Sequence, residues 1–421
     1  MKYIDLFAGA GGLSEGFMRA GFEAVAHIEM NPDAVNTIKT RLCYYYLKRC
    51  NMLDLYNKYL KGAISRSELY EYVPSSIIKT ALNYAMSEEN LEEIFGHVDS
   101  LMIEQRTEEV DIIVGGPPCQ AYSLAGQSKQ RRDAKNRSEE DISDDERKYL
   151  YRLYCNFLRR YNPKMFVFEN VPGLLSSDGG RHYESILTHL TESGYTVEAR
   201  TLNSKNFGVM QNRKRIIIIG WRIDLQLRYP EIMEIPQDQV LATLFQDLPS
   251  LQSGDTASQY TNIPMSEYVR DKGFRVADDV FTWHIARPNI DRDREIYRIA
   301  ASMWRDGQRR LKYQDLPAHL RTHKNTKDFT DRYKVVPSDM TFSHTVLAHI
   351  SKDGHYYIHP DVEQARSLTV REAARIQSFP DSYFFEGSRT SAFTQIGNAV
   401  PPLMAEQIAI GIRNILKEEN G

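Results

Sequence analysis

Cysteine is scarce in this sequence, and its spacing is uninformative as a metal or disulfide pattern. The 421 residues include 4 cysteines: Cys43, Cys50, Cys119 and Cys155. None belongs to a Cys-x-x-Cys pair, and no Cys/His group has zinc-finger spacing. We therefore expect a protein of a reducing compartment, with no metal and no disulfide framework.

Long apolar runs are also missing. The most apolar stretch, IIIIGW at 216–221, is far shorter than the ~20 residues of a membrane-spanning helix. The opening MKYIDLFAGAGG lacks the basic and then apolar pattern of a signal peptide. With 42% hydrophobic and 26% charged residues, the composition is that of a soluble globular protein. We expect a cytoplasmic location and no membrane association.

The chain has no excess of positive charge. Its formal net charge of −3 excludes a molecule that binds nucleic acid through its overall charge. Locally, however, the segment from Arg287 to Lys334 contains 13 Lys/Arg against 7 Asp/Glu, whereas EEDISDDE at 139–146 is acidic. A basic segment is usually a solvated surface, so it supports nucleic-acid binding only together with other observations.

Strand-like and helix-like segments alternate through the first half of the chain. We expect strands at 3–9, 24–29, 111–116, 165–171, 195–203 and 213–222. Several of these are continuously apolar, which is typical of strands buried on both faces. The pattern predicts an α/β fold, with a Rossmann-like parallel sheet that helices cover on both faces.

The pattern changes at about residue 223, and the chain is too long for one ordinary core. Helical patterning resumes at 367–380, with Thr369 as the expected N-cap and Pro380 as the stop. An amphipathic pattern at 401–419 predicts a C-terminal helix that folds back beside strand one, which we expect at an edge of the sheet. We therefore predict a main domain of residues 1–222 and 366–421, with a smaller inserted domain at 223–365.

The stretch DLFAGAGG follows a predicted strand and opens a helix. Its glycines let a ligand approach the backbone, but Gly9, Gly11 and Gly12 lack the G-x-G-x-x-G spacing of a dinucleotide site. Asp5 disfavours a phosphate, and Glu29 ends the second strand, where a carboxylate can hold ribose hydroxyls. These features favour an adenosine ligand without phosphates over a dinucleotide oxidoreductase. The alternative is a tight strand–helix turn without a ligand.

The stretch GGPPCQAYSLAG presents a thiol at the end of the 111–116 strand. The carboxyl ends of parallel strands form the ligand-binding edge of an open α/β sheet. Pro117 and Pro118 restrict the backbone just before Cys119. A rigid thiol at that edge indicates a nucleophile. The alternative is a buried structural cysteine.

Two further stretches carry polar side chains to the same region. MFVFENV ends in Glu169, whose carboxyl would lie near Cys119 and could act as an acid with a raised pKa. The alternative role is a cap for the following loop. In QNRKRIIIIG, Arg213 and Arg215 would share one face of a strand and could hold a carbonyl oxygen, a carboxylate or a phosphate. The alternative is a solvated strand start.

Taken in order, these stretches resemble the blocks of the DNA (cytosine-5) methyltransferase family. The matching blocks are DLFAGAGGLSEGF, IEMNPDA, GGPPCQAYSLAG, FVFENVPGLL, QNRKRIIIIG, RSLTVREAARIQSFPD and QIGNAVPPLMAEQIA. They extend along the chain apart from an insert at about 43–98 and the 223–365 region. Together they are far more specific than any one of them alone.

The resemblance implies a fold, a cofactor and a set of site residues. It implies S-adenosyl-L-methionine as the cofactor, held by Phe7, Gly9, Ala10, Gly12, Glu29, Met30, Pro118 and Asn398. It also implies an aspartate at the adenine, for which we favour Asp99 over Asp54. It implies Cys119 as the nucleophile, Glu169 on the target base, and Arg213 and Arg215 at the base and the catalytic cysteine. The 223–365 region would recognise the target.

The resemblance further implies a reaction on double-stranded DNA. Cys119 would add to carbon 6 of a cytosine flipped out of the duplex, while the segment through Gly126 closes over the DNA. We expect a monomeric modification enzyme of a restriction-modification system, with a companion endonuclease as a further partner. A tRNA cytosine-5 methyltransferase on the same scaffold is the alternative. A non-catalytic DNA-binding module is disfavoured, because Cys119, Glu169 and both arginines are all present.

Overall fold

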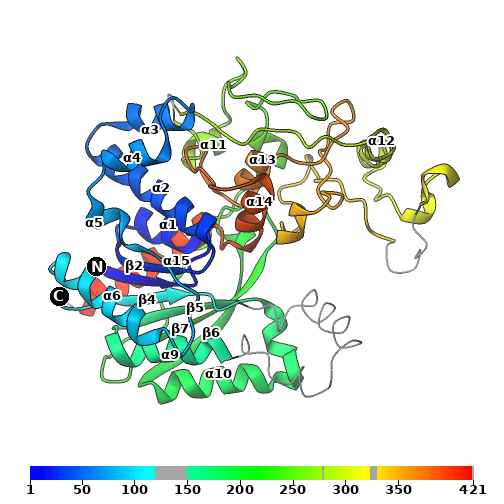
Figure 1. Ribbon diagram of the computed structural model, residues 1–421. Coiled ribbons are helices and arrows are strands. Elements are labelled where there is room, and N and C mark those ends of the chain that lie inside the picture. Colours follow the sequence, from blue (N-terminus) through cyan, green and yellow to red (C-terminus); the bar gives the residue numbers. More distant parts are fainter. Residues whose placement is uncertain (119–148, 277–278, 323–329, 420–421) are drawn as a thin grey trace.

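A seven-stranded sheet covered by helices forms the core of the computed structural model (Figure 1). The structure describes residues 1–118, 149–276, 279–322 and 330–419. Cys119, the segment expected to close behind it and the acidic stretch 139–146 lie outside these residues. The strands are β1 (Lys2–Leu6), β2 (Glu23–Glu29), β3 (Ala81–Asn83), β4 (Ile112–Gly115), β5 (Met165–Asn170), β6 (Tyr195–Asn203) and β7 (Lys214–Arg222).

The strand order is β3-β2-β1-β4-β5-β7-β6. The first five strands are parallel, whereas β7 runs antiparallel to both β5 and β6. The α/β prediction is confirmed, with a mixed rather than wholly parallel sheet. The expectation that strand one lies at an edge is wrong, because the chain starts in the middle of the sheet and winds outward in both directions.

Helices cover both faces of this sheet. The α-helices of the described residues are α1 (Gly12–Arg19), α2 (Pro32–Arg49), α3 (Leu53–Leu60), α4 (Arg66–Glu71), α5 (Ser75–Ile78), α6 (Leu91–Glu104), α9 (Leu150–Tyr161), α10 (Arg181–Glu192), α11 (Glu267–Asp271), α12 (Asp291–Gly307), α13 (Val370–Ile376), α14 (Arg389–Asn398) and α15 (Pro402–Glu419). One buried cluster joins α1 and α15 to the sheet, and another joins α6, α9 and α10 to the opposite face (Figure 1). Among the described residues, no helix combines the length and apolarity needed to cross a membrane.

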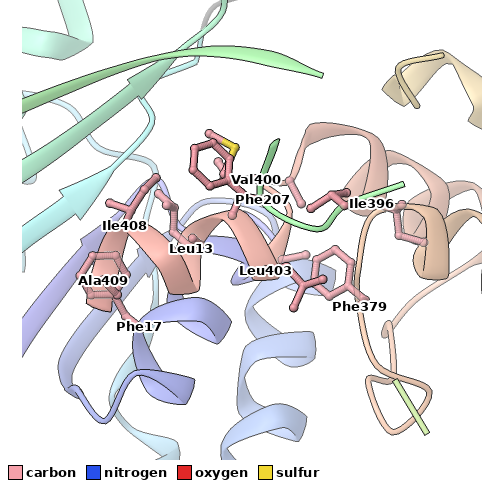
Figure 2. Close-up of a cluster of buried hydrophobic side chains, with 14 of the residues drawn as sticks. Leu13, Phe17, Phe207, Phe379, Ile396, Val400, Leu403, Ile408 and Ala409 are labelled. Atoms are coloured by element: carbon pink, nitrogen blue, oxygen red, sulfur yellow. The ribbon is translucent and has the colours of Figure 1, made fainter. Parts of the chain in front are cut away.

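Helix α15 packs closely against α1 (Figure 2). Figure 2 shows Leu13 and Phe17 of α1 beside Ile408 and Ala409 of α15. A Cβ atom on Gly16 would lie 2.4 Å from the Cβ of Ala405, so only glycine permits this approach. The last helix of the chain therefore shares its core with the first.

The predicted cap of the 367–380 helix is confirmed, but the predicted stop is wrong. Thr369 accepts a hydrogen bond from the backbone N–H of Glu372, whose carboxylate in turn accepts from the backbone N–H of Thr369. Helix α13 ends at Ile376, four residues before Pro380. Ser378 adopts a positive φ of 64°, which reverses the chain before the proline is reached.

The 223–365 region is mostly irregular, and it has a hydrophobic cluster of its own around α12. The buried members include Ile296, Tyr297, Ala300, Leu311, Tyr313, Leu316, Leu320, Tyr333, Val335 and Ile358. The boundaries predicted for this inserted domain stay a prediction.

The 43–98 insert forms the short helices α3 to α5 around a tyrosine-rich cluster. Its contact with the C-terminal part of the chain centres on the carboxylate of Glu386. That carboxylate accepts hydrogen bonds from Tyr59 at 2.6 Å and from Arg66 at 3.3 Å. The insert is therefore fastened to the main fold and is not a separate appendage.

Candidate active site

The site lies where the winding direction of the sheet reverses. From β1 the chain builds β2 and β3 on one side, and β4 and β5 lie on the other side. Leu6 and Gly115 are paired in register, so the turns that follow β1 and β4 lie side by side. In an open α/β sheet this crevice at the carboxyl ends of the strands is the ligand-binding position.

The glycine-rich turn after β1 bends sharply away from the sheet. Phe7, Gly9 and Gly11 all adopt positive φ values, of 57°, 56° and 74°. A Cβ atom added to Gly9 would meet nothing within 4 Å, so the space above this backbone is open. The turn leads directly into α1 at Gly12, whose first N–H groups are free to face a ligand.

The C-terminal part of the chain supports the turn from behind. The hydroxyl of Tyr383 donates a hydrogen bond to the carbonyl of Ala10 at 2.5 Å. A Cβ atom on Gly12 would lie 2.3 Å from the carbonyl oxygen of Val400. Position 12 therefore requires glycine because the backbone at Val400 packs directly against it. Gly9, in contrast, lies beside open space.

The carboxylate of Glu29 is fixed beside the glycine-rich turn. One oxygen accepts the backbone N–H of Gly9 at 2.8 Å, and the other accepts that of Asn31 at 2.8 Å. The neighbouring Met30 leaves 63% of its surface exposed, which is unusual for a large apolar side chain. An acidic acceptor and an apolar surface thus lie together at the end of β2.

Asn83 is a site residue that sequence reasoning missed. Its side-chain amide donates to the carbonyls of Glu29 at 3.0 Å and of Met30 at 2.9 Å, which holds the end of β2 in place. Asn83 ends β3, which is only three residues long and shows no periodicity. The one available signal in the sequence was the position of this polar residue directly after the apolar pair Ala81 and Leu82, which is typical of the end of a short buried strand.

Asp5 is a fully buried carboxyl beneath the turn. Its Oδ2 accepts a 2.5 Å hydrogen bond from the hydroxyl of Ser14, while Oδ1 has no hydrogen-bond partner among the described residues. Burial raises the pKa of Asp5 to about 7, the Ser14 hydrogen bond opposes the rise, and the charge of Glu29 adds to it.

Glu169 and Arg215 form an ion pair at the same edge. Because β7 runs antiparallel to β5, the start of β7 lies beside the end of β5. The Nε atom of Arg215 is 2.5 Å from Oε1 of Glu169, and their side chains are only 9% and 13% exposed. A Cβ atom on Gly116 would lie 2.6 Å from the other oxygen of Glu169. The pair therefore borders the turn that leads to Cys119.

Asn170 links the end of β5 to that turn. Its side-chain amide donates to the carbonyl of Pro117 at 3.4 Å, and its Oδ1 accepts the backbone N–H of Val171 at 2.9 Å. Pro118, which is partly buried, is the last residue before the part of the chain that is not described. The end of β4 and Pro117, which precede Cys119 in the sequence, are thus held by Asn170 and by the close approach of Gly116 to Glu169.

Arg213 occupies a different place from the one expected. Its guanidinium is fully buried and donates to the carbonyl of Val346 at 2.8 Å and to that of Gly397 at 3.0 Å. The expectation that Arg213 shares a face with Arg215 is corrected, because β7 begins at Lys214 and the two-residue period applies only within a strand. Arg213 instead connects three segments of the chain.

Two other predicted cofactor residues have contrasting positions. Asn398 is exposed at the end of α14, directly after the Gly397 carbonyl that Arg213 binds. Asp99, in contrast, lies on α6, where it accepts hydrogen bonds from Arg160 at 2.6 Å and Tyr161 at 3.1 Å. Because Arg160 and Tyr161 end the helix that leads into the start of β5, this pair lies toward the opposite edge of the sheet. The structure therefore corrects the assignment of Asp99 to the adenine.

The fold and this edge define a class of α/β enzyme with a nucleoside-type site at the switch point of the sheet. A profile for the C-5 cytosine-specific DNA methylase family matches residues 1–55 and 67–414, and the chain belongs to this family. It is therefore a DNA cytosine-5 methyltransferase. The predicted family is confirmed.

Individual relatives agree with the family. The chain is 42% identical to Type II methyltransferase M.Bpa9945I of Bacillus paralicheniformis, over 99% of each chain. It is 29% identical to Type II methyltransferase M.AgeI of Thalassovita gelatinovora, over 98% of this chain and all of the relative. A solved structure of a putative DNA modification methyltransferase from a prophage of E. coli matches over 99% of each chain, with a TM-score of 0.63 and 21% identity. This last similarity shows the fold.

Proposed function

We propose that this methyltransferase acts on carbon 5 of a cytosine flipped out of duplex DNA, within one short recognition sequence. The observation that carries the proposal is the Glu169–Arg215 ion pair beside the turn that leads to Cys119. The relatives named as Type II methyltransferases support a role as the modification enzyme of a restriction-modification system. We further propose that it works as a cytoplasmic monomer, with an endonuclease of the same specificity in the cell.

S-adenosyl-L-methionine fits the residues at the β1–β2 edge. The open backbone at Gly9 admits a ligand, the fixed carboxylate of Glu29 suits ribose hydroxyls, and exposed Met30 offers an apolar surface for the adenine. The carboxyls of Asp5 and Glu29 make the edge unsuitable for phosphates. We propose that Phe7, Ala10, Gly12, Pro118 and Asn398 complete the site. When bound, the cofactor supplies an electrophilic methyl group.

The base would occupy the β4–β5 edge. The ends of β2 and β5 are three strand spacings apart, or ~14 Å, so the adenosine and the base occupy separate positions on one edge. We propose that the thiolate of Cys119 adds to carbon 6 of the cytosine and leaves carbon 5 electron-rich. Glu169 takes up a proton from solvent as the base enters and shares it with ring nitrogen 3 as negative charge develops, and Arg215 holds the base oxygen.

The remaining steps restore the aromatic base. Carbon 5 takes the methyl group and then loses its proton to a water molecule acting as base, while ring nitrogen 3 returns its proton to Glu169. Cys119 leaves carbon 6 with the electron pair of the carbon–sulfur bond, and the double bond reforms. Arg215 orients the Glu169 carboxyl before the base enters, because its Nε atom lies 2.5 Å from Oε1. No observation favours the alternative substrate, tRNA.

Trapping with a fluorinated base tests this proposal. Duplex DNA with 5-fluorocytosine in the recognition sequence should form a covalent complex in the presence of S-adenosyl-L-methionine, because fluorine cannot leave carbon 5 as a proton does. Bisulfite sequencing of DNA from expressing cells first identifies the sequence. Cys119→Ala should bind the cofactor and form no covalent complex. Methylation of tRNA but not of DNA, or a covalent complex with Cys119→Ala, would refute the proposal.

A further inference from the structure

A hollow of about 140 Å³ opens where the start of β7 meets the inserted region. Its walls include Asn212, Trp304, Arg310, Lys334 and Phe342. Asn212 is fastened to the inserted region, because its backbone N–H donates to the carbonyl of Ser343 at 2.9 Å. Thr345 donates to the carbonyl of Asn212 at 2.6 Å. The hollow is therefore held against the segment that continues into Arg215.

Cations surround this hollow. Arg310 is exposed, and within the described part of the chain no hydrogen bond or ion pair engages its guanidinium. Lys334 contributes a second cation and is paired with Asp331 at 2.6 Å. The Nζ atom of Lys205 lies 4.9 Å from the centre of the Phe342 ring and adds a third. A free guanidinium at the wall of a small hollow suits an anion with several acceptor oxygens, such as a phosphate.

Aromatic side chains form another part of the wall. The indole N–H of Trp304 donates to Asp339 at 2.8 Å, which fixes the ring at the end of α12. The carboxylate of Asp339 also accepts a hydrogen bond from the side-chain amide of Gln308. Both of these donors to Asp339, Trp304 and Gln308, are neutral side chains. Phe342 is a second aromatic ring among the residues that line the hollow. Cations combined with aromatic rings match the two parts of a nucleotide, its phosphate and its base.

We propose that this hollow seats one nucleotide of the DNA strand next to the target cytosine, with its phosphate on Arg310 and Lys334. The inference rests on the proposed function, because a cytosine at Arg215 brings its flanking backbone to Asn212. Asn212 and Arg215 are three positions apart in the sequence, which spans about 10 Å of extended chain. Phosphate contacts of this kind fix the position of a protein on DNA without reading its sequence.

A modified DNA backbone tests the assignment. Neutral methylphosphonates are placed one at a time at the phosphates that flank the target cytosine, and binding is measured for the unmodified protein and for Arg310→Ala. One position should weaken binding of the unmodified protein clearly more than binding of Arg310→Ala, since the variant has already lost the Arg310 contact and keeps only that of Lys334. Between 50 and 200 mM salt, the DNA affinity of both proteins should fall. The fold-decrease should be about three times smaller for Arg310→Ala than for the unmodified protein, because the variant makes one phosphate contact fewer.

Arg309→Ala is the matched control, because Arg309 is exposed in the same loop and does not line the hollow. Its affinity for each modified duplex should follow that of the unmodified protein. Equal losses in both variants, or no position that couples to Arg310→Ala, would overturn the assignment. The unmodified protein must also methylate the unmodified duplex. If it does not, the proposed function fails. If it does, but no phosphate couples to Arg310, only the assignment of the hollow to a nucleotide is refuted.

Discussion

Glu169 shows how one residue acquires its role from its neighbours. It ends an otherwise buried apolar strand, where a carboxylate without a partner would be costly. Arg215 from the antiparallel strand β7 supplies the partner, and Gly116 leaves room for the second oxygen. The carboxyl is thus oriented in advance of the base that it is proposed to protonate.

Glu169→Gln should lower kcat by about 10²-fold or more, because it removes the proton donor while keeping the shape of the side chain. The affinity for S-adenosyl-L-methionine, measured by calorimetry, should stay unchanged, since Glu169 lies on β5 and the proposed adenosine site on β1 and β2. Glu198→Gln, at an exposed glutamate of β6 paired with Arg200, is the control and should keep full activity. An active Glu169→Gln variant would exclude Glu169 as the acid.

Asp5 should make the stability of the protein depend on pH. Its pKa is raised to about 7 in the folded state, against an ordinary value of 3.8 for the unfolded chain. The folded state therefore holds the proton more tightly, so stability falls as the pH rises from about 4 to about 7 and then levels off.

Asp5→Asn should remove this dependence, because the amide has no charge to bury. At pH 8 the variant should be more stable than the unmodified protein by an amount on the order of 4 kcal/mol, and near pH 4 the difference should vanish. Denaturant unfolding at a series of pH values measures both. A constant difference at all pH values would show that Asp5 does not titrate in this range.

At the scale of elements, the contact between α1 and α15 supports the cofactor turn. Both helices bury apolar side chains in one cluster, and α1 begins directly after the glycine-rich turn (Figure 2). Gly16 allows the two backbones to approach closely, since its Cβ position lies 2.4 Å from atoms of Ala405 and Glu406. The position of the turn therefore depends on a helix almost 400 residues later in the chain.

Gly16→Ala should destabilise the protein by roughly 1–3 kcal/mol, because the added methyl group meets backbone that cannot move freely. Gly96→Ala in α6 is the matched control, since a Cβ atom there meets nothing within 4 Å. Alanine at position 96 should be neutral or stabilise by up to ~1 kcal/mol through its higher helix propensity. The thermal unfolding midpoint should fall in Gly16→Ala and should stay the same or rise in Gly96→Ala. An unchanged midpoint in Gly16→Ala would contradict the packing argument.

At the scale of the whole molecule, the inserted region and the main fold are joined by buried polar contacts. Arg213 binds Val346 of the inserted region and Gly397 near the C-terminus. Arg375 of α13 pairs with Asp247 and Asp381, and none of the three side chains is exposed to solvent. Such fully buried pairs hold their segments in one arrangement, because breaking them would leave charges unpaired.

Exchanging residues 223–365 for the corresponding region of M.Bpa9945I tests the proposed target-recognition role. The hybrid should methylate the sequence that the donor of the region recognises, as measured by bisulfite sequencing, because the contacts that read the bases around the target cytosine are proposed to come from that region. The buried partners of Arg213 and Arg375 should be kept, so that a folding failure is not mistaken for lost recognition. An unchanged sequence preference would refute the assignment.

Much of the architecture follows from local patterns. Apolar runs ending in glycine predicted the strands before the glycine-rich turn and before Pro117, and Thr369 predicted its helix start. Arg213, Asp99 and Asn83 were different, because the partner of a polar side chain depends on which distant segments meet it. Arg213 resembles Arg215 in sequence, yet one guanidinium binds carbonyls of two remote segments and the other binds Glu169.

The sequence by itself determined the α/β class, the family and the chemical groups of the site, because strand periodicity, glycine turns and residue types are local properties. Only the tertiary structure decided that β1 lies inside the sheet and that Glu169 pairs with Arg215. It also decided that Asp99 pairs with Arg160 and Tyr161 at the end of α9. These outcomes depend on strand order and on contacts between remote segments, for which the packing of the whole chain selects one arrangement.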